Sequence, residues 1–156
     1  MVKIKFPDGA TRSYESGLTP YEIASSISSG LARNIISSDF NGQKIETTTQ
    51  IFDDGNLTFY TWKDDEGKKA FWHSTAHLLA QVLEEFYVGI KLTIGPAISN
   101  GFYYDIDFGK HSMSEKDFLK IEKRMIEIAR EKHEFKLRSI SKKEALDFYK
   151  KNKYLI

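Results

Sequence analysis

Seven residues without an apolar side chain, Lys63 to Lys69, divide the sequence into two parts with different patterns. Before this run, short alternating segments are separated by Gly, Pro, Asp and Asn, which is typical of strands and turns. After it, apolar residues recur at the three- and four-residue spacing of amphipathic helices. Because neither pattern continues through the run, we predict two domains, residues 1–62 and residues 63–156.

The first part predicts a small sheet folded over one helix. Residues 2–6 and 11–15 alternate on either side of a Pro-Asp-Gly turn, which indicates a hairpin. Thr19, Pro20 and Glu22 form a helix-start pattern, and Gly30 is expected to end that helix. Further strands are expected over residues 32–37, 43–46 and 57–62. We expect a ubiquitin-like β-grasp domain, in which two hairpins flank the crossing helix.

The second part predicts a mixed helix and strand domain, so the whole chain is assigned to the α+β class. Helices are expected over residues 70–87, 115–132 and 142–151, the last two opened by capping serines. A hairpin of residues 92–98 and 102–108 should bend at Gly95-Pro96. A further strand is expected over residues 134–139.

Composition excludes several classes of protein. The chain has 40% hydrophobic residues, which is typical of a folded domain, and no cysteine, which excludes disulfides, thiolate metal sites and a cysteine nucleophile. No apolar run is long enough to span a bilayer, so we expect a cytoplasmic protein without a membrane partner.

Charge is distributed unevenly along the chain. Residues 1–109 hold 9 Lys/Arg against 14 Asp/Glu, whereas residues 110–156 hold 14 against 8. The net charge is therefore −5 in the first stretch and +6 in the second. A basic C-terminal third favours a phosphate-rich partner, although lysine-rich exposed helix faces would give the same composition.

His73 and His77 lie four residues apart in the best helical stretch, which places both imidazoles on one helix face. Three interpretations stay open on the residues alone. A metal site would have only two ligands, and Ser74 stands where a zinc protease helix carries its general base. The rings could instead be hydrogen-bonded histidines at the edge of the core. They could also transfer protons in a cleft near neutral pH.

A resemblance to a known family favours the third interpretation. The chain opens with V-x-I-x-F-P-D-G and continues with the HSTAH-L-L helix, and I-G-P-x-x-x-N-G-F-Y-Y-D follows at residues 94–105. This order, with Glu122-Lys123-Arg124-Met125 further on, resembles the N-terminal region of threonyl-tRNA synthetases. In that family the first module is the TGS domain and the second an editing domain that hydrolyses serine wrongly attached to the threonine tRNA.

The resemblance implies a site and its partners. It implies that His73 and His77 place the ester and an attacking water, and that Tyr104 and Asp105 bind substrate, with Tyr103 a weaker candidate. Neighbouring strand residues point to opposite faces, so at most one of the two tyrosines should line a given pocket. The implied partners are the acceptor end of the threonine tRNA and the remainder of the synthetase chain, which is expected to form a homodimer.

The chain also departs from the family pattern. The family's editing site draws on a C-x-G-P-H pattern that this sequence lacks, so we expect a fragment: a complete TGS domain and the front part of an editing domain. ATP, Mg and Zn are expected in the parent enzyme only, with no cofactor and no metal site in this piece. We expect no threonine ligation and weak or no deacylation by the fragment. The alternative is a non-catalytic TGS-type RNA-binding or regulatory module.

Overall fold

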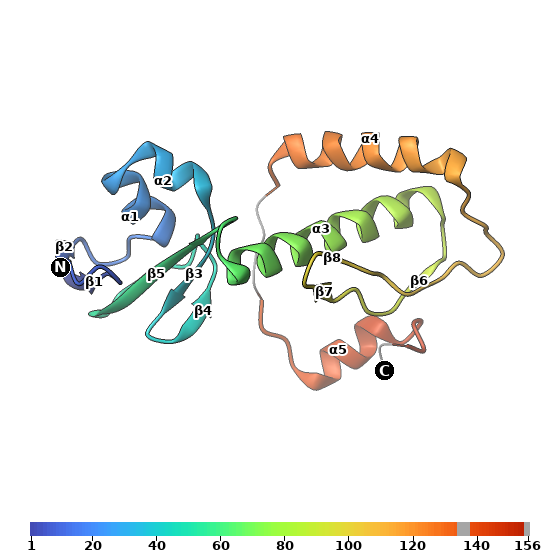
Figure 1. Ribbon diagram of the computed structural model, residues 1–156. Coiled ribbons are helices and arrows are strands. Elements are labelled where there is room, and N and C mark those ends of the chain that lie inside the picture. Colours follow the sequence, from blue (N-terminus) through green and yellow to red (C-terminus); the bar gives the residue numbers. More distant parts are fainter. Residues whose placement is uncertain (134–137, 155–156) are drawn as a thin grey trace. The chain divides into compact units, whose positions relative to one another are not determined.

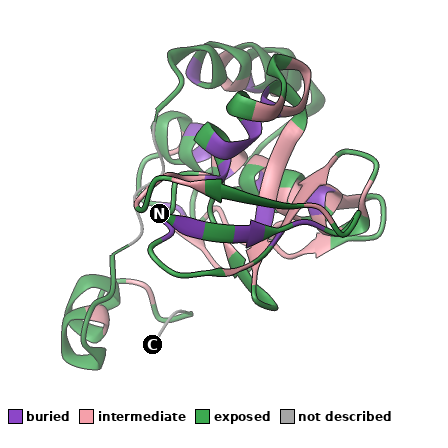
Figure 2. Cartoon of the chain, turned by 90° about the vertical axis from the view of Figure 1, so that its left-hand side faces the viewer, coloured by how far each residue is buried: buried purple, intermediate pink, exposed green. Residues whose placement is uncertain are grey.

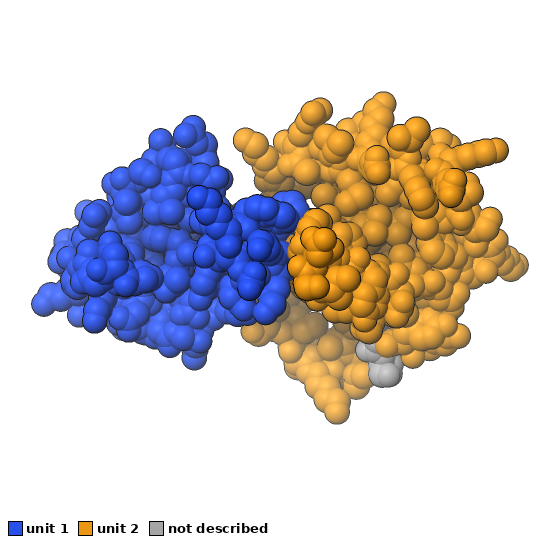
Figure 3. All heavy atoms as spheres, in the orientation of Figure 1, with its two compact units in different colours: residues 1–71 blue, residues 72–156 orange. Residues whose placement is uncertain are grey.

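The computed structural model of the chain contains two compact units, residues 1–71 and residues 72–156 (Figure 3). It describes residues 1–133 and 138–154. The contacts within the chain divide it after Phe71, inside a long helix. The predicted domain boundary after residue 62 stays a prediction.

The first unit contains a five-stranded sheet in the order β2-β1-β5-β3-β4 (Figure 1). Strands β1 and β5 are parallel and the other neighbours are antiparallel. The strands are β1 (Val2–Lys5), β2 (Thr11–Tyr14), β3 (Ile35–Phe40), β4 (Gln43–Ile45) and β5 (Gly55–Thr61). The hairpins β1–β2 and β3–β4 flank helix α1 (Pro20–Ile27), which confirms the predicted β-grasp arrangement and the α+β class.

Alternation along β1 explains how the sheet holds α1. Val2 and Ile4 are buried, whereas Lys3 and Lys5 are exposed (Figure 2). The buried face joins one apolar cluster with residues from α1, β5 and two loops: Phe6, Ile23, Ile51 and Leu57. Each such side chain contributes about 1.5–3 kcal/mol when fully buried. This cluster therefore fixes the helix on the sheet.

Helix α1 begins as predicted but ends earlier. The Thr19 backbone N–H donates to Glu22 Oε2 at 2.8 Å, and the Glu22 N–H donates to Thr19 Oγ1 at 3.2 Å. The predicted end at Gly30 is wrong. Ser28 is extended, with φ −163°, and its Oγ accepts the Leu31 N–H at 3.0 Å. This cap starts a second helix, α2 (Ser29–Asn34), so the strand expected from residue 32 begins only at Ile35.

Helix α3 (Asp65–Phe86) begins five residues before the predicted start at residue 70. The Asp64 carboxylate accepts the Thr61 N–H at 2.7 Å and the Thr61 hydroxyl at 2.9 Å, which closes the turn before the helix. Asp65 and Glu66 occupy the first turn, where the helix dipole favours acidic side chains. Glu66 also forms an ion pair with Lys44 of β4. The polar run is therefore mostly helix.

The second unit contains the rest of α3, short strands, and the helices α4 (Glu115–Glu131) and α5 (Lys142–Tyr149). Helices α3 and α4 pack against each other through one apolar cluster. The buried members of the cluster come from α3, the loop after it and α4: Val82, Leu83, Ile90, Ile121 and Ile128. A bidentate ion pair, from Arg124 Nε and Nη2 to the Glu85 carboxylate at 2.7 and 3.2 Å, also joins α4 to α3.

The long hairpin expected over residues 92–108 is interrupted. It consists of two short ladders, β6 (Lys91–Leu92) with β9 (Ile106–Asp107) and β7 (Ala97–Ile98) with β8 (Gly101–Phe102). Between them the Asp105 N–H donates to the Ile94 carbonyl at 3.0 Å. The break coincides with Gly95-Pro96, where proline has no N–H for a ladder.

One sequence prediction lies outside the described residues. The strand expected over residues 134–139 falls largely on residues 134–137, which the structure does not describe. Helices α4 and α5, on either side, lie within a few residues of the ranges predicted for them.

Ser38→Ala in β3 is expected to raise the free energy of unfolding by about 1 kcal/mol. Ser38 is fully buried, and its hydroxyl has no hydrogen-bond partner among the described residues. Replacing the hydroxyl group removes an unsatisfied polar atom and leaves the backbone ladder intact. Urea unfolding measures the change. Ser37→Ala, at the neighbouring half-buried position, should stay within about 0.5 kcal/mol. A loss of stability in Ser38→Ala alone would contradict the prediction.

Candidate functional site

The two histidines of α3 contact each other directly. His73 and His77 are both exposed, and they lie roughly 60–120° round the helix from the buried Ala76 and Leu83, at the edge of the buried face. Their Nε2 atoms lie 3.0 Å apart, and their ring planes are nearly perpendicular, at 85°. At this distance one ring donates an N–H to the lone pair of the other. The pair therefore holds one proton between two facing nitrogens.

Charge is disfavoured at His77. Its pKa lies below the ordinary value, first because partial burial disfavours the charged ring and second because His73 lies beside it. A neutral imidazole keeps a free lone pair, which can accept a proton. The pair is thus arranged as a base and a neighbour that orients it.

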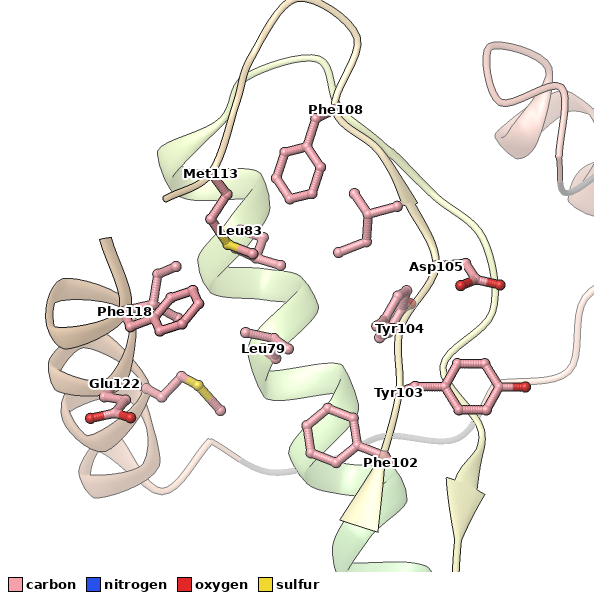
Figure 4. Close-up of a pocket in the computed structure, with 13 residues that line it drawn as sticks. Leu79, Leu83, Phe102, Tyr103, Tyr104, Asp105, Phe108, Met113, Phe118 and Glu122 are labelled. Atoms are coloured by element: carbon pink, nitrogen blue, oxygen red, sulfur yellow. The ribbon is translucent and has the colours of Figure 1, made fainter. Parts of the chain in front are cut away.

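The hairpin residues implied by the resemblance lie on two sides of their segment. Tyr104 is half-buried, and its pKa is raised, first by burial and then by the charges of Glu84 and Tyr149. Tyr103 is 48% exposed, and its ring points away from α3 (Figure 4). The carboxylate of Asp105 also points away from that helix (Figure 4). The expectation that the two tyrosines face opposite ways therefore agrees with their positions.

A hollow of about 630 Å³ lies between α3, the hairpin segment and α4. Most of the residues that line it are apolar, and Asp105 and Glu122 are the acidic ones (Figure 4). The principal lining residues are Leu79, Leu83, Phe102, Tyr104, Phe108 and Met125. Tyr103, Tyr104 and Asp105 all line this hollow, so the expectation that at most one of the two tyrosines would line a given pocket is wrong: their rings face opposite ways, yet both residues border the same open space. Neither histidine is among the described residues that line it. The structure thus groups the four predicted residues in two pairs.

Glu84 of α3 lies near Tyr104 and on the same face of the helix as His77. It follows His77 by seven residues, two helical turns along the same face and about 10 Å along the axis. Its carboxylate is close enough to Tyr104 to help raise the pKa of that hydroxyl. The sequence reasoning did not select Glu84, although its helical spacing from His77 was a usable signal.

The absence of a side chain at Gly95 leaves room for the Tyr104 ring. A Cβ atom at residue 95 would overlap the aromatic carbons of Tyr104. The sequence indicated Gly95 only as an interruption of a strand. Its contact with a ring nine positions later follows from the folded hairpin, which no local pattern specifies.

Gly95→Ala is expected to cost about 1–3 kcal/mol of unfolding free energy, because the added methyl overpacks the site against Tyr104. In a Tyr104→Ala background the same change should cost much less, since the clashing ring is gone. Urea unfolding of the unchanged protein, the two single variants and the double variant gives the interaction energy between positions 95 and 104. Equal costs in both backgrounds would show that Tyr104 does not occupy this position.

Arg124, in the basic C-terminal third, is surrounded by acidic partners. Arg124 binds Glu85, and Glu127 and Glu131 each lie 3.5 Å from it. Seven further cations of this third, which its charge makes candidates for a phosphate-binding face together with Arg124, are exposed: Lys110, Lys116, Lys120, Lys123, Arg138, Lys142 and Lys143. Arg124 is therefore a poor candidate for contact with a nucleic acid.

Neither a metal cluster nor a membrane helix is found in the described part of the chain. Within residues 1–133 and 138–154, no three His, Asp or Glu side chains gather closely enough to hold a metal ion. No helix in these ranges combines the length and apolarity needed to cross a bilayer.

Comparison with known proteins gives a domain and a set of relatives. Residues 2–61 match the TGS domain family. The chain is 58% identical over 154 residues to the threonine–tRNA ligase of Flavobacterium psychrophilum, and 60% identical over 154 residues to that of Flavobacterium johnsoniae. Each alignment covers 99% of this chain and 24% of the relative. The ligase of Cytophaga hutchinsonii is 48% identical over 96% of the chain and 23% of its own length. The chain thus spans about a quarter of these relatives, and the resemblance drawn from its motifs is confirmed.

Proposed function

We propose that this chain, which matches the N-terminal region of threonine–tRNA ligases and opens with a TGS domain, contributes to hydrolytic editing of serine-mischarged tRNA. The observation that carries the proposal is the contact between His73 and His77, whose Nε2 atoms face each other at 3.0 Å on an exposed helix face. The parent enzyme would attach threonine to its tRNA with ATP, on parts of the chain outside these residues.

Chemistry explains why such an enzyme needs a second site. Serine lacks one methyl group of threonine, and a missing methyl or methylene in a binding pocket is worth only about 1–3 kcal/mol of discrimination. Binding alone therefore admits serine too often. A separate hydrolytic site removes the wrong amino acid after transfer.

The proposed step is a base-assisted hydrolysis of the aminoacyl ester. A neutral imidazole of the pair accepts a proton as water attacks the ester carbonyl carbon. The bond between that carbon and the ribose oxygen then breaks, and the proton returns to the ribose oxygen. Free serine and uncharged tRNA are released. This step needs no metal ion, in agreement with the two-nitrogen donor set.

Tyr104 and Asp105 are proposed to hold the substrate beyond the ester. They line the hollow between α3 and α4, and Tyr104 adjoins Glu84, two turns after His77 on α3. A substrate that extends along this face of α3 would place its ester at the histidines and another part at Tyr104. The acceptor end of the threonine tRNA is such a substrate.

The isolated chain is proposed to hold only part of this site. The histidines do not line the hollow that contains Tyr104, so other residues of the ligase would complete the enclosure. ATP, Mg and Zn would belong to the parent enzyme, which we propose to be a cytoplasmic homodimer. A purely RNA-binding or regulatory role is supported only for residues 2–61, since that is where the TGS match lies.

The test compares three samples with serine-charged and threonine-charged threonine tRNA. A full-length ligase that contains this region should hydrolyse the serine ester faster than the threonine ester. The isolated chain should hydrolyse either ester slowly or not at all, and buffer gives the background. Rapid turnover by the isolated chain would refute the partial site. Background rates with the full ligase would refute the editing role.

A further inference from the structure

The sequence holds two Asn-Gly pairs that the proposed function does not use, Asn41-Gly42 and Asn100-Gly101. Each lies at a hairpin turn, the first between β3 and β4 and the second between β7 and β8. Glycine has no side chain to keep its nitrogen away from the amide carbon of the preceding asparagine. Each pair therefore has the residue types for an attack of the glycine nitrogen on that carbon, with loss of ammonia.

The fold holds both reacting groups of the first pair. Asn41 Oδ1 accepts the Asn56 N–H at 2.8 Å, and the Gly42 N–H donates to Asp39 Oδ1 at 2.7 Å. The Asn41 side chain also packs against Gly55, where even a Cβ atom would overlap it. Because hydrogen bonds to a carboxylate are the stronger kind, the Gly42 nitrogen stays turned toward Asp39 and keeps its proton.

The second pair is held by fewer contacts. Asn100 is exposed, and its side chain makes no hydrogen bond within residues 1–133 and 138–154. The ladder beside it pairs only Ala97 with Phe102 and Ile98 with Gly101. Strand β3, in contrast, pairs with β4 on one edge and with β5 on the other. The short ladder therefore opens at a lower cost and lets the main chain at Asn100 reach the geometry for ring closure.

The two turns also differ in backbone conformation. Asn41 and Gly42 have φ values of 54° and 83°, the combination of positive angles that the favoured two-residue hairpin turn requires. Neither Ser99 nor Asn100 has a positive φ. The turn between β7 and β8 thus lacks the twist that suits a hairpin, which makes it the less stable of the two.

We propose that Asn100 is a site of spontaneous deamidation and that the fold protects Asn41 from the same reaction. The Gly101 nitrogen gives its proton to the solvent and attacks Cγ of Asn100. A bond from this nitrogen to Cγ forms, the bond from Cγ to Nδ2 breaks, and Nδ2 leaves as ammonia with a proton from water. A further water opens the cyclic imide at one of its two carbonyl carbons, which gives aspartate or isoaspartate at residue 100.

A consequence for editing rests on the proposed function. Isoaspartate carries the main chain through its own side-chain carbons, which lengthens the turn just before β8 and should displace Tyr104. A full-length ligase aged in buffer should therefore lose deacylation of serine-charged tRNA to a greater extent than an Asn100→Gln ligase aged alongside it. Each is compared with its own fresh sample. Equal losses would refute only this consequence, because the modification is measured on the chain alone.

The experiment incubates the purified chain at neutral and at mildly alkaline pH and then digests it with trypsin. Cleavage after Lys and Arg places the two pairs in separate peptides, residues 34–44 and 92–110. Mass spectrometry measures the conversion of amide to acid in each peptide, and an isoaspartyl methyltransferase with a labelled methyl donor counts isoaspartate. The rate should rise with pH, because the attacking nitrogen must lose its proton.

Each rate is divided by that of a synthetic peptide with the same sequence, which removes the effect of neighbouring residues. Asn100 should then react about tenfold or more faster than Asn41, because Asn41 must first break hydrogen bonds that Asn100 does not make. Asp39→Ala, which frees the Gly42 N–H, should speed the reaction at Asn41 and leave Asn100 unchanged.

Asn100→Gln is the matched control, since its longer side chain would have to close a six-membered ring. This variant should show no amide loss in the peptide of residues 92–110, which contains no other asparagine or glutamine. Equal corrected rates at the two pairs, or a faster reaction at Asn41, would overturn the proposal. An Asn100 that stays intact while its synthetic peptide reacts would overturn it as well.

Discussion

Gly67→Ala is expected to lower the free energy of unfolding of the N-terminal unit by about 3 kcal/mol or more. Overpacking costs about 1–3 kcal/mol when flexible side chains can adjust, and more when they cannot. A Cβ at residue 67 would overlap the backbone carbonyl of Thr61, which is a rigid neighbour. With typical domain stabilities of about 5–15 kcal/mol, such a loss leaves a large unfolded fraction near physiological temperature.

The Thr61 carbonyl cannot move away cheaply. Thr61 pairs with Ile35 at the end of the β3–β5 ladder, and its N–H and hydroxyl both bind Asp64. The Asp64 N–H in turn donates to the Thr61 carbonyl at 3.0 Å. The methyl group therefore has to disturb the ladder, the turn or the start of α3.

Gly30→Ala is the matched control, because it makes the same change inside another helix. The nearest atom to a Cβ at residue 30 is Ser28 Oγ at 3.8 Å, an ordinary contact. Alanine is a better helix former than glycine by about 1 kcal/mol, so this variant should be slightly more stable. Urea unfolding of both variants tests the opposite signs. A stabilised Gly67→Ala protein would contradict the close approach of α3 to Thr61.

His77→Ala, in a full-length ligase that carries this region, is expected to slow hydrolysis of serine-charged threonine tRNA by about 10²–10⁴-fold. That is the usual contribution of a positioned general base. Aminoacylation with threonine should keep its rate, since we place that chemistry outside these residues. The deacylation rate on serine-charged tRNA, measured with labelled serine, gives the size of the loss.

The shared contact between the rings sharpens this expectation. If His73 acts by orienting His77 through the 3.0 Å contact, the double variant should lose little more activity than His77→Ala alone. His111→Ala should behave like the unchanged ligase, because that ring contacts a backbone carbonyl of the loop after α3. If the rate losses of His73→Ala and His77→Ala multiply in the double variant, the two residues do not act jointly. An unchanged deacylation rate in His77→Ala would refute its role as the base.

Local patterns predicted the starts of α1, α4 and α5, but not those of α2 and α3. Thr19 with Glu22, and Ser141 with Glu144, form the reciprocal cap hydrogen bonds that their spacing indicates. A cap involves residues three apart, so its energy depends little on the rest of the fold. The helix end at Gly30 failed because Ser28 offered a second cap two residues earlier. Two competing local signals cannot be ranked from sequence without the surrounding contacts.

Long-range contacts were beyond the sequence patterns. The start of α3 at Asp65 depends on Thr61 at the end of a strand and on Lys44 of another strand. The break in the hairpin over residues 91–107 puts Tyr104 over Gly95 in place of a regular ladder. Both outcomes join residues that no local period relates.

The sequence by itself determined the α+β class, the β-grasp order of the first unit, the placement of His73 and His77 on one helix face, and the resemblance to threonyl-tRNA synthetases. These follow from short periods and ordered motifs, which are properties of neighbouring residues. Only the tertiary structure decided that the Nε2 atoms meet at 3.0 Å and that Tyr104 lines a hollow apart from them. Side-chain torsions and the packing of α3, the hairpin and α4 set those positions, and packing is a property of the whole unit.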